Sequence, residues 1–158
     1  MLKIYQQTLS KPVNLKGQGL HTGKKCTIKI LPAEADQGII FKRTDLDKNN
    51  IISANYKNVS SAKLCTTLTN KFGVRVSTVE HLLAAFYISG IDNVIIEIDS
   101  EEVPIMDGSA AVFVNEIQKQ NLKELSKKRK YLRVLKKVDL EDGEKKISIE
   151  KGNSSLEV

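Results

Sequence analysis

The sequence has no tryptophan, and its 158 residues include only two cysteines, two histidines and three prolines. Two cysteines make no disulfide framework, so an ordinary packed core must hold the fold together. Aromatic residues make up only 5% of the chain, so we expect a core of Val, Ile, Leu and Ala. No apolar run approaches the ~18 residues of a transmembrane segment, and the amino terminus lacks the apolar stretch of a signal peptide. These absences predict a reduced, cytoplasmic protein.

Positive charge is abundant but unevenly distributed. The formal net charge is +6, and residues 122–158 carry +4 of it. The excess is concentrated in the segment 127–137, KKRKYLRVLKK, whose one aromatic residue is Tyr131. Such a run can bind the phosphates of a nucleic acid. A solvated linker, or a strand with one wet face, is the more common interpretation of the same pattern.

Two helices and several strands are expected from the sequence patterns. Glycines in the segment 17–23, GQGLHTG, predict a loop. One helix is expected over 78–89, with Gly90 as a left-handed stop, and a second over 110–120, capped by Ser109. Alternation and β-branched residues predict strands over 26–33, 38–43, 64–70 and 92–99.

The order of these elements predicts an α+β fold with a domain boundary near residue 127. Residues 1–126 are expected to form a two-layer sandwich, in which a mostly antiparallel sheet carries two helices on one face. Residues 127–158 are expected to be a basic linker and a hairpin that turns at 141–143. Because an isolated hairpin is marginal in water, we interpret it as the start of a second, similar domain and the chain as truncated.

The helix predicted over 78–89 begins with an acid and a histidine, Glu80 and His81. Ser77 and Glu80 fit a capping box, in which the glutamate would only bond the backbone at the helix start. The side of the helix opposite the core stripe is also apolar, and a helix that is apolar all round is buried on both faces. We therefore expect either a further layer or self-association over a patch formed by Ala84, Ala85 and Ile88.

Histidine and cysteine are the candidate metal ligands. His81 lies near a helix N-terminus, whose dipole favours the neutral imidazole that binds metals. Together with His21, Cys26 and Cys65 it could form a Cys₂His₂ zinc site, but no two of the four have the short spacing that is usual in such sites. The cysteines are more typical of small buried residues. His21 lies on a glycine-flanked loop, where backbone can approach a ligand closely.

Five segments of the chain resemble one known family. They are GLHTG (19–23), LCTTL (64–68), RVSTVEHLLAA (75–85), GIDNVIIEID (90–99) and EVPIMDGSAA (102–111). In this order and spacing they resemble the amino-terminal half of the UDP-3-O-acyl-N-acetylglucosamine deacetylases, zinc amidases of lipid A biosynthesis in Gram-negative bacteria. The resemblance implies two α+β domains that pack through their helical layers. The second apolar face of the helix 78–89 would then contact the other domain.

The same resemblance implies roles for single residues. His81 matches one of three protein ligands of the zinc ion, and Glu80 matches the general base that takes a proton from the attacking water. Acetate would then leave the glucosamine nitrogen of UDP-3-O-acyl-N-acetylglucosamine. His21, Leu64 and Cys65 resemble walls of the substrate site.

The remaining zinc ligands of the family belong to the second domain. We therefore expect these 158 residues alone to hold no zinc and to be inactive. The alternative function, a free-standing basic module, would instead bind nucleic acid or another anionic partner through the segment 127–137. The Glu80–His81 pair favours the deacetylase, which needs no specific nucleic acid.

Overall fold

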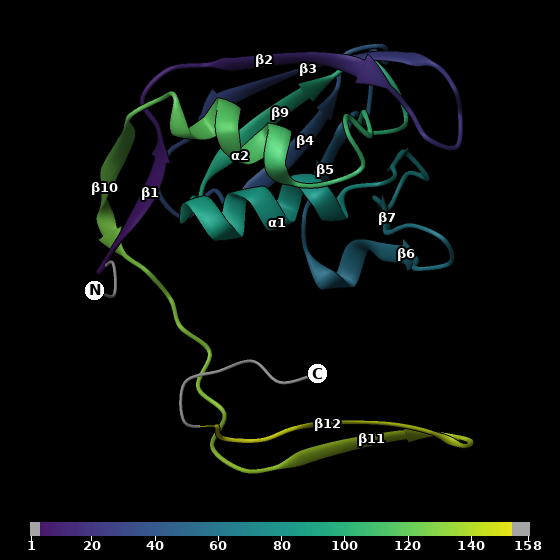
Figure 1. Ribbon diagram of the computed structural model, residues 1–158, viewed down its shortest axis with the longest axis vertical. Helices are drawn as coiled ribbons and strands as arrows, with labels where there is room; N and C mark the ends of the chain where they lie inside the picture. The colour runs from purple at the N-terminus through teal and green to yellow at the C-terminus, as the bar shows by residue number, and fades with distance from the viewer. Residues whose placement is uncertain (1–3, 153–158) are drawn as a thin grey trace.

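Five strands form the main sheet of the computed structural model, which describes residues 4–152. Neighbouring strands are antiparallel except β4 and β9, which run parallel. In the β3–β9 ladder Ile28 lies opposite Ile98, and Ile30 lies opposite Ile96. All four side chains are fully buried, because the two-residue period of a strand places them on one face. The sheet order is β2 (Val13–Gln18), β3 (Lys25–Pro32), β9 (Val94–Ile98), β4 (Ile39–Arg43) and β5 (Ile51–Ser53) (Figure 1).

The other strands of the described residues form three smaller antiparallel sheets. The sequence patterns predicted β3, β4 and β9, but missed β1, β2, β5, β6, β8 and β10. A short 3-10 helix, Tyr56–Asn58, precedes β6. The smaller sheets pair β1 (Tyr5–Leu9) with β10 (Leu122–Lys128), β7 (Thr67–Thr69) with both β6 (Val59–Ser61) and β8 (Arg75–Val76), and β11 (Val138–Asp142) with β12 (Lys145–Ile149).

Two helices, α1 (Glu80–Ser89) and α2 (Ala111–Gln118), contact each other and lie in front of the main sheet in Figure 1. Their buried side chains join the strand residues in one hydrophobic cluster. The predicted α+β class, with mostly antiparallel strands and two helices, is therefore confirmed. The prediction of one sheet is wrong, because the strands fall into several sheets. The buried helical residues are Leu82, Ala85, Phe86, Phe113 and Ile117.

The start of α1 differs from the predicted capping box. The Ser77 hydroxyl donates to the Glu101 carbonyl (3.2 Å), and the Glu80 carboxylate accepts from the Thr66 N–H (3.0 Å) instead of turning back on the helix. Thr78 has a φ of 56°, outside the helical range. This left-handed residue delays the helix by two residues relative to the prediction and separates Ser77 from the first turn.

The ends of the helices follow the predicted signals more closely. Gly90 has a φ of 73° and terminates α1, as expected of a left-handed stop. The Ser109 hydroxyl accepts the Ala111 N–H (3.0 Å), so it satisfies one donor at the start of α2. The helix itself is shorter at both ends than the predicted range 110–120.

One loop prediction and one strand prediction need correction. β2 continues through Gly17, which lies opposite Cys26 in the β2–β3 ladder, so the turn is shorter than 17–23. A Cβ on Gly17 would lie 2.8 Å from the Pro104 Cβ, so the glycine serves close packing within a strand. The predicted strand 64–70 is reduced to β7, because Leu64 has a φ of 67° and lies with Cys65 in a bend.

One face of α1 is left exposed, but it differs from the predicted patch at one residue. Ala85 is fully buried and belongs to the core. The exposed face consists of Ala84, Tyr87 and Ile88, and the last two side chains are 88% and 64% exposed. A helix with this much uncovered apolar surface is still consistent with a further packing layer.

The carboxy-terminal part contains the predicted hairpin, which Figure 1 shows apart from the main sheet. Gly143, with a φ of 60°, lies in its turn, and every residue of β11 and β12 is exposed. Lys127 and Lys128, at the start of the basic segment, belong to β10, and the Arg129 N–H donates to the Ile4 carbonyl (2.8 Å). Among the described residues, neither helix has the length and apolar character that crossing a membrane requires.

Candidate active site

Glu80 and His81 are the first two residues of α1, and both are half-buried. The backbone just before them pairs with two other segments. The Ser77 N–H donates to the Glu101 carbonyl (2.9 Å), and the Val79 N–H donates to the Thr66 carbonyl (3.5 Å). The pair is therefore presented where the helix start meets the bend before β7 and the segment after β9.

The Glu80 carboxylate itself contacts the bend before β7. Its Oε2 accepts the Thr66 N–H at 3.0 Å, which brings the bend carrying Leu64 and Cys65 close to the helix start. The Leu64 side chain is 85% exposed. Cys65 is half-buried, and its Sγ lies 3.8 Å from the Thr67 hydroxyl. One carboxylate oxygen of Glu80, Oε2, thus holds the bend.

Glu102, which the sequence analysis did not single out, is the most buried carboxylate near this site. Its side chain is fully buried. Oε1 accepts the His21 N–H (3.0 Å) and the Thr78 hydroxyl (3.0 Å), and Oε2 accepts the Thr22 N–H (2.8 Å). One side chain therefore joins the turn after β2 to the backbone that leads into α1.

The hydrogen bonds to Glu102 also keep it ionised. Burial acts to raise the pKa of the carboxyl, but the donors from His21, Thr22 and Thr78 outweigh it and lower the pKa to about 2. A buried charge is tolerated when such donors satisfy its oxygens. Glu102 is therefore a fixed anion at neutral pH.

His21 is joined to the site through its backbone. Its side chain is exposed, whereas its N–H is held by Glu102. No hydrogen bond between the side chain of His21 and those of Glu80 or His81 occurs in the described structure. The structure therefore places the loop of His21 next to the helix start through its backbone.

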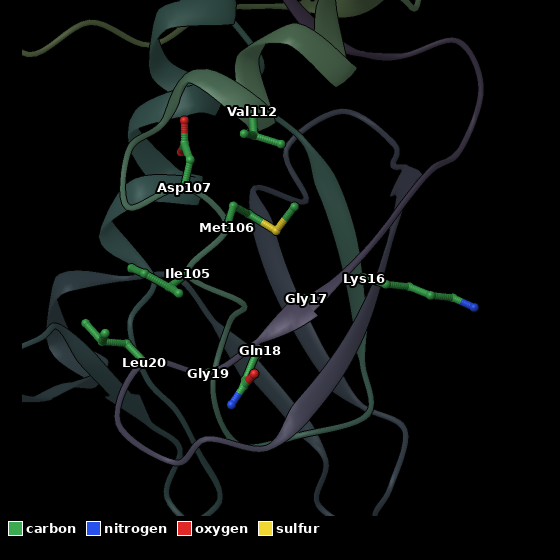
Figure 2. Close-up of a pocket in the computed structure, with 9 residues that line it drawn as sticks. All are labelled: Lys16, Gly17, Gln18, Gly19, Leu20, Ile105, Met106, Asp107 and Val112. Carbon is green, nitrogen blue, oxygen red and sulfur yellow. The ribbon is translucent and has the colours of Figure 1, made fainter.

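Asp107 is a second acidic residue beside the helix start. Hydrogen bonds from the Ser109 N–H (3.0 Å) and hydroxyl (2.9 Å) lower the pKa of its carboxyl, and His81 lies close enough to lower it further when the imidazole is protonated. Figure 2 shows Asp107 and Met106 lining a pocket of about 640 Å³ together with Gly17, whereas the Lys16 side chain points away. The pocket is open, and its apolar and polar groups are mixed.

Three of the five non-glycine residues with positive φ in the described part of the chain lie around the same helix start. Leu64, Thr78 and Met106 have φ values of 67°, 56° and 55°, and they lie in the bend, the helix entry and the segment beside Asp107. Left-handed backbone is unfavourable for residues with a Cβ, above all for a β-branched threonine. Such strain persists where the surroundings enforce it, and it clusters at functional sites.

The described residues do not by themselves form a metal site. Within residues 4–152, no group of three or more His, Cys, Asp or Glu side chains could hold an ion, so the alternative Cys₂His₂ arrangement is not formed. Burial, followed by the charge of Asp99, raises the pKa of the Cys26 thiol to about 12, so the thiol is protonated at neutral pH. Among the described residues, His81 therefore has no set of partner side chains that could hold a metal ion with it.

Sequence reasoning missed Glu102 because its local signal is that of a surface residue. It follows Glu101 in an acidic pair before Val103 and Pro104, and charged residues are seldom fully buried. The feature that marks Glu102 is its close approach to Gly19, where a Cβ would overlap the Glu102 carboxylate. That close approach depends on tertiary packing, which a single sequence does not reveal.

The low pKa of Glu102 predicts a specific loss of stability in acid. Because the folded pKa is about 2 and the ordinary value is 4.5, the ionised carboxylate stabilises the fold fully above pH 4.5. This contribution, about 3 kcal/mol, is lost as the pH falls from 4.5 towards 2. We expect the difference in unfolding free energy between wild type and Glu102→Gln to shrink over this range, measured by urea denaturation at several pH values. If this difference in unfolding free energy stayed constant with pH, the low pKa of Glu102 would be contradicted.

Comparisons with known proteins agree on one family. The sequence model of the UDP-3-O-acyl N-acetylglycosamine deacetylase family matches residues 6–158. The chain is 48% identical over 142 residues to a UDP-3-O-acyl-N-acetylglucosamine deacetylase of Aliivibrio fischeri, covering 90% of this chain and 47% of that protein. It is 49% identical over 146 residues to the deacetylase of Syntrophotalea carbinolica, covering 92% and 47%. The chain spans about half the length of the curated relatives it matches.

Proposed function

We propose that this chain, which belongs to the UDP-3-O-acyl N-acetylglycosamine deacetylase family, supplies the general base and one metal ligand of a zinc-dependent deacetylase. The observation that carries the proposal is the placement of Glu80 and His81 together at the first turn of α1. Glu80 is the base, and His81 is the ligand. The remaining ligands are contributed from outside the described residues 4–152, because these offer no three-residue metal cluster.

The reaction proposed is hydrolysis of the N-acetyl group of UDP-3-O-acyl-N-acetylglucosamine, a step of lipid A biosynthesis. Zinc, when bound, polarises the acetamide carbonyl and makes the attacking water more acidic. Glu80 takes a proton from that water as its oxygen bonds to the acetyl carbon. The C–N bond then breaks, acetate leaves, and the glucosamine nitrogen takes up a proton that balances the one Glu80 accepted from the water. The bend carrying Leu64 and Cys65 and the turn carrying His21 flank the substrate.

The exposed face of α1, formed by Ala84, Tyr87 and Ile88, is proposed to pack against a second α+β domain. Residues 1–126 would form the first domain together with the end of its last strand, β10, which continues to Lys128. The residues after β10 would be a linker and the opening hairpin of the second domain. Arg129 anchors this linker, because its Nη2 donates to the Asp92 carboxylate (2.7 Å). In a chain without the second domain, the exposed face is available for self-association.

No observation favours the nucleic-acid alternative. Two cations of the basic segment already have partners, since Arg129 pairs with Asp92 and Lys130 lies 3.6 Å from the Asp36 carboxylate. Tyr131 is exposed, but one aromatic side chain makes no stacking platform.

The test of the proposal is acetate release from UDP-3-O-acyl-N-acetylglucosamine by the complete protein that contains this chain. We expect release that stops when a chelator removes zinc and returns when zinc is added. Zinc-loaded protein that folds and releases no acetate would contradict the proposal.

The 158-residue chain alone is expected to hold far less than one zinc ion per molecule at neutral pH, because one imidazole cannot replace three converging ligands. Metal analysis after dialysis is the measurement. One tightly held zinc per chain would show that the ligand set lies within these residues.

A further inference from the structure

We infer that Glu102 is a positioning residue of this site: its carboxylate fixes the turn that carries His21 to the backbone that orients Glu80 and His81. The inference rests on the proposed function for the roles of those three residues. Its geometric part, the link between the turn and the helix start, stands on the structure alone.

The first support is the set of donors that Glu102 collects. Two come from the turn after β2, the N–H groups of His21 and Thr22, and one is the hydroxyl of Thr78 at the helix entry. These elements are more than fifty residues apart in the chain. In the described structure Glu102 forms no salt bridge, so hydrogen bonds compensate the burial of its charge.

The second support is the fit of the turn around the carboxylate. Gly19 is buried, and a Cβ at this position would overlap both the Glu102 carboxylate and the Thr22 hydroxyl. The backbone of the turn can approach the carboxylate this closely only because Gly19 has no side chain. The turn therefore closes on Glu102, which places His21 relative to the helix.

The third support is the strain at Thr78. A β-branched residue with a φ of 56° is held there by its surroundings. Glu102 accepts its hydroxyl, and the neighbouring Ser77 carbonyl accepts the Val103 N–H (3.1 Å). Because Glu80 follows two residues later, relaxation of the Thr78 backbone would rotate the first turn of α1 and displace the Glu80 carboxylate.

The decisive variant is Glu102→Gln, which keeps the size of the side chain but removes its charge. Its matched control is Glu101→Gln. Glu101 is the adjacent carboxylate, and its side chain forms surface ion pairs with Lys24 and Arg75. Groups that orient catalytic or metal-binding residues are typically worth ~10- to 100-fold in activity. We therefore expect kcat of Glu102→Gln to fall by ~10- to 100-fold, whereas kcat of Glu101→Gln stays within about twofold of wild type.

Kinetics are measured on the complete protein well below its melting temperature, with zinc content determined for each variant. Thr78→Val is the second variant, because it removes the hydroxyl donor and keeps the carboxylate with its two backbone donors. If Glu102→Gln does not fold, the kcat of Thr78→Val tests the inference instead. Variants that melt earlier but retain wild-type kcat would overturn the inference, since Glu102 would then serve stability alone.

Imidazole NMR signals of the 158-residue chain separate this inference from the proposed function. The chain has only two histidines, so both signals are assigned with single substitutions. We expect Glu102→Gln to shift the ring signals of His21 and His81, and Glu101→Gln to leave both in place. If the wild-type protein released no acetate, the proposed function would fail, and the two NMR signals would still decide the positional link. Unchanged signals in folded Glu102→Gln would refute it.

Discussion

Glu80→Gln in the complete protein is expected to lower the rate of acetate release by ~10²- to 10⁴-fold, the usual contribution of a positioned general base. The amide cannot accept the proton of the attacking water. Its oxygen can still accept the Thr66 N–H that Glu80 holds at 3.0 Å, so the bend and the helix start should stay in place. The measurement is steady-state turnover, with zinc content and thermal melting determined for the same samples.

The matched control for this substitution is Glu116→Gln. Glu116 lies on α2 and pairs with Lys119 at the surface (2.6 Å), so the substitution removes the same charge away from the site. We expect its turnover to stay within about twofold of wild type, since isolated surface pairs contribute little. If Glu80→Gln retained near-normal turnover and only melted earlier, Glu80 would be a structural residue and the mechanism would be wrong.

Phe86→Ala is expected to destabilise the fold by about 3–5 kcal/mol, because it empties a fully buried aromatic site in the core. The adjacent aromatic residue provides the control. Tyr87 is 88% exposed on the same helix, so Tyr87→Ala should change stability by less than about 0.5 kcal/mol. Urea denaturation of the 158-residue chain gives both values. Equal losses would contradict the assignment of the two faces of α1.

The same Tyr87 variant tests the exposed face of α1. We expect the wild-type chain to self-associate in sedimentation experiments through Ala84, Tyr87 and Ile88, and Tyr87→Ala to weaken that association. A wild-type chain that stays monomeric at high concentration would argue against an uncovered packing surface on this helix.

Local periodicity predicted the parts of the fold whose neighbours lie nearby in the chain or whose faces are clearly apolar. β3, β4 and β9 have alternating or β-branched patterns, and Gly90 supplies a left-handed stop. Short or polar strands such as β1 and β10 gave no such signal. They form because they pair with each other across more than a hundred residues, and that pairing is invisible in either segment alone.

The candidate site, like the fold, was only partly predictable from local sequence patterns. Glu80 and His81 could be selected because two polar residues begin an otherwise apolar helix. The capping box failed because it assumed ordinary backbone at Thr78, whose φ is 56°. That conformation depends on Glu102, and the burial of Glu102 depends on the turn around Gly19. Each step is a tertiary contact, so no local pattern could have predicted it.

The central claim, that His81 is the zinc ligand of this chain, is tested most directly by the zinc content of the complete protein. The chain has only two histidines, so His81→Ala and His21→Ala form a natural pair. The account predicts one zinc per molecule in wild type and in His21→Ala, and a large loss of bound zinc in His81→Ala after dialysis. Full zinc retention by folded His81→Ala would contradict it.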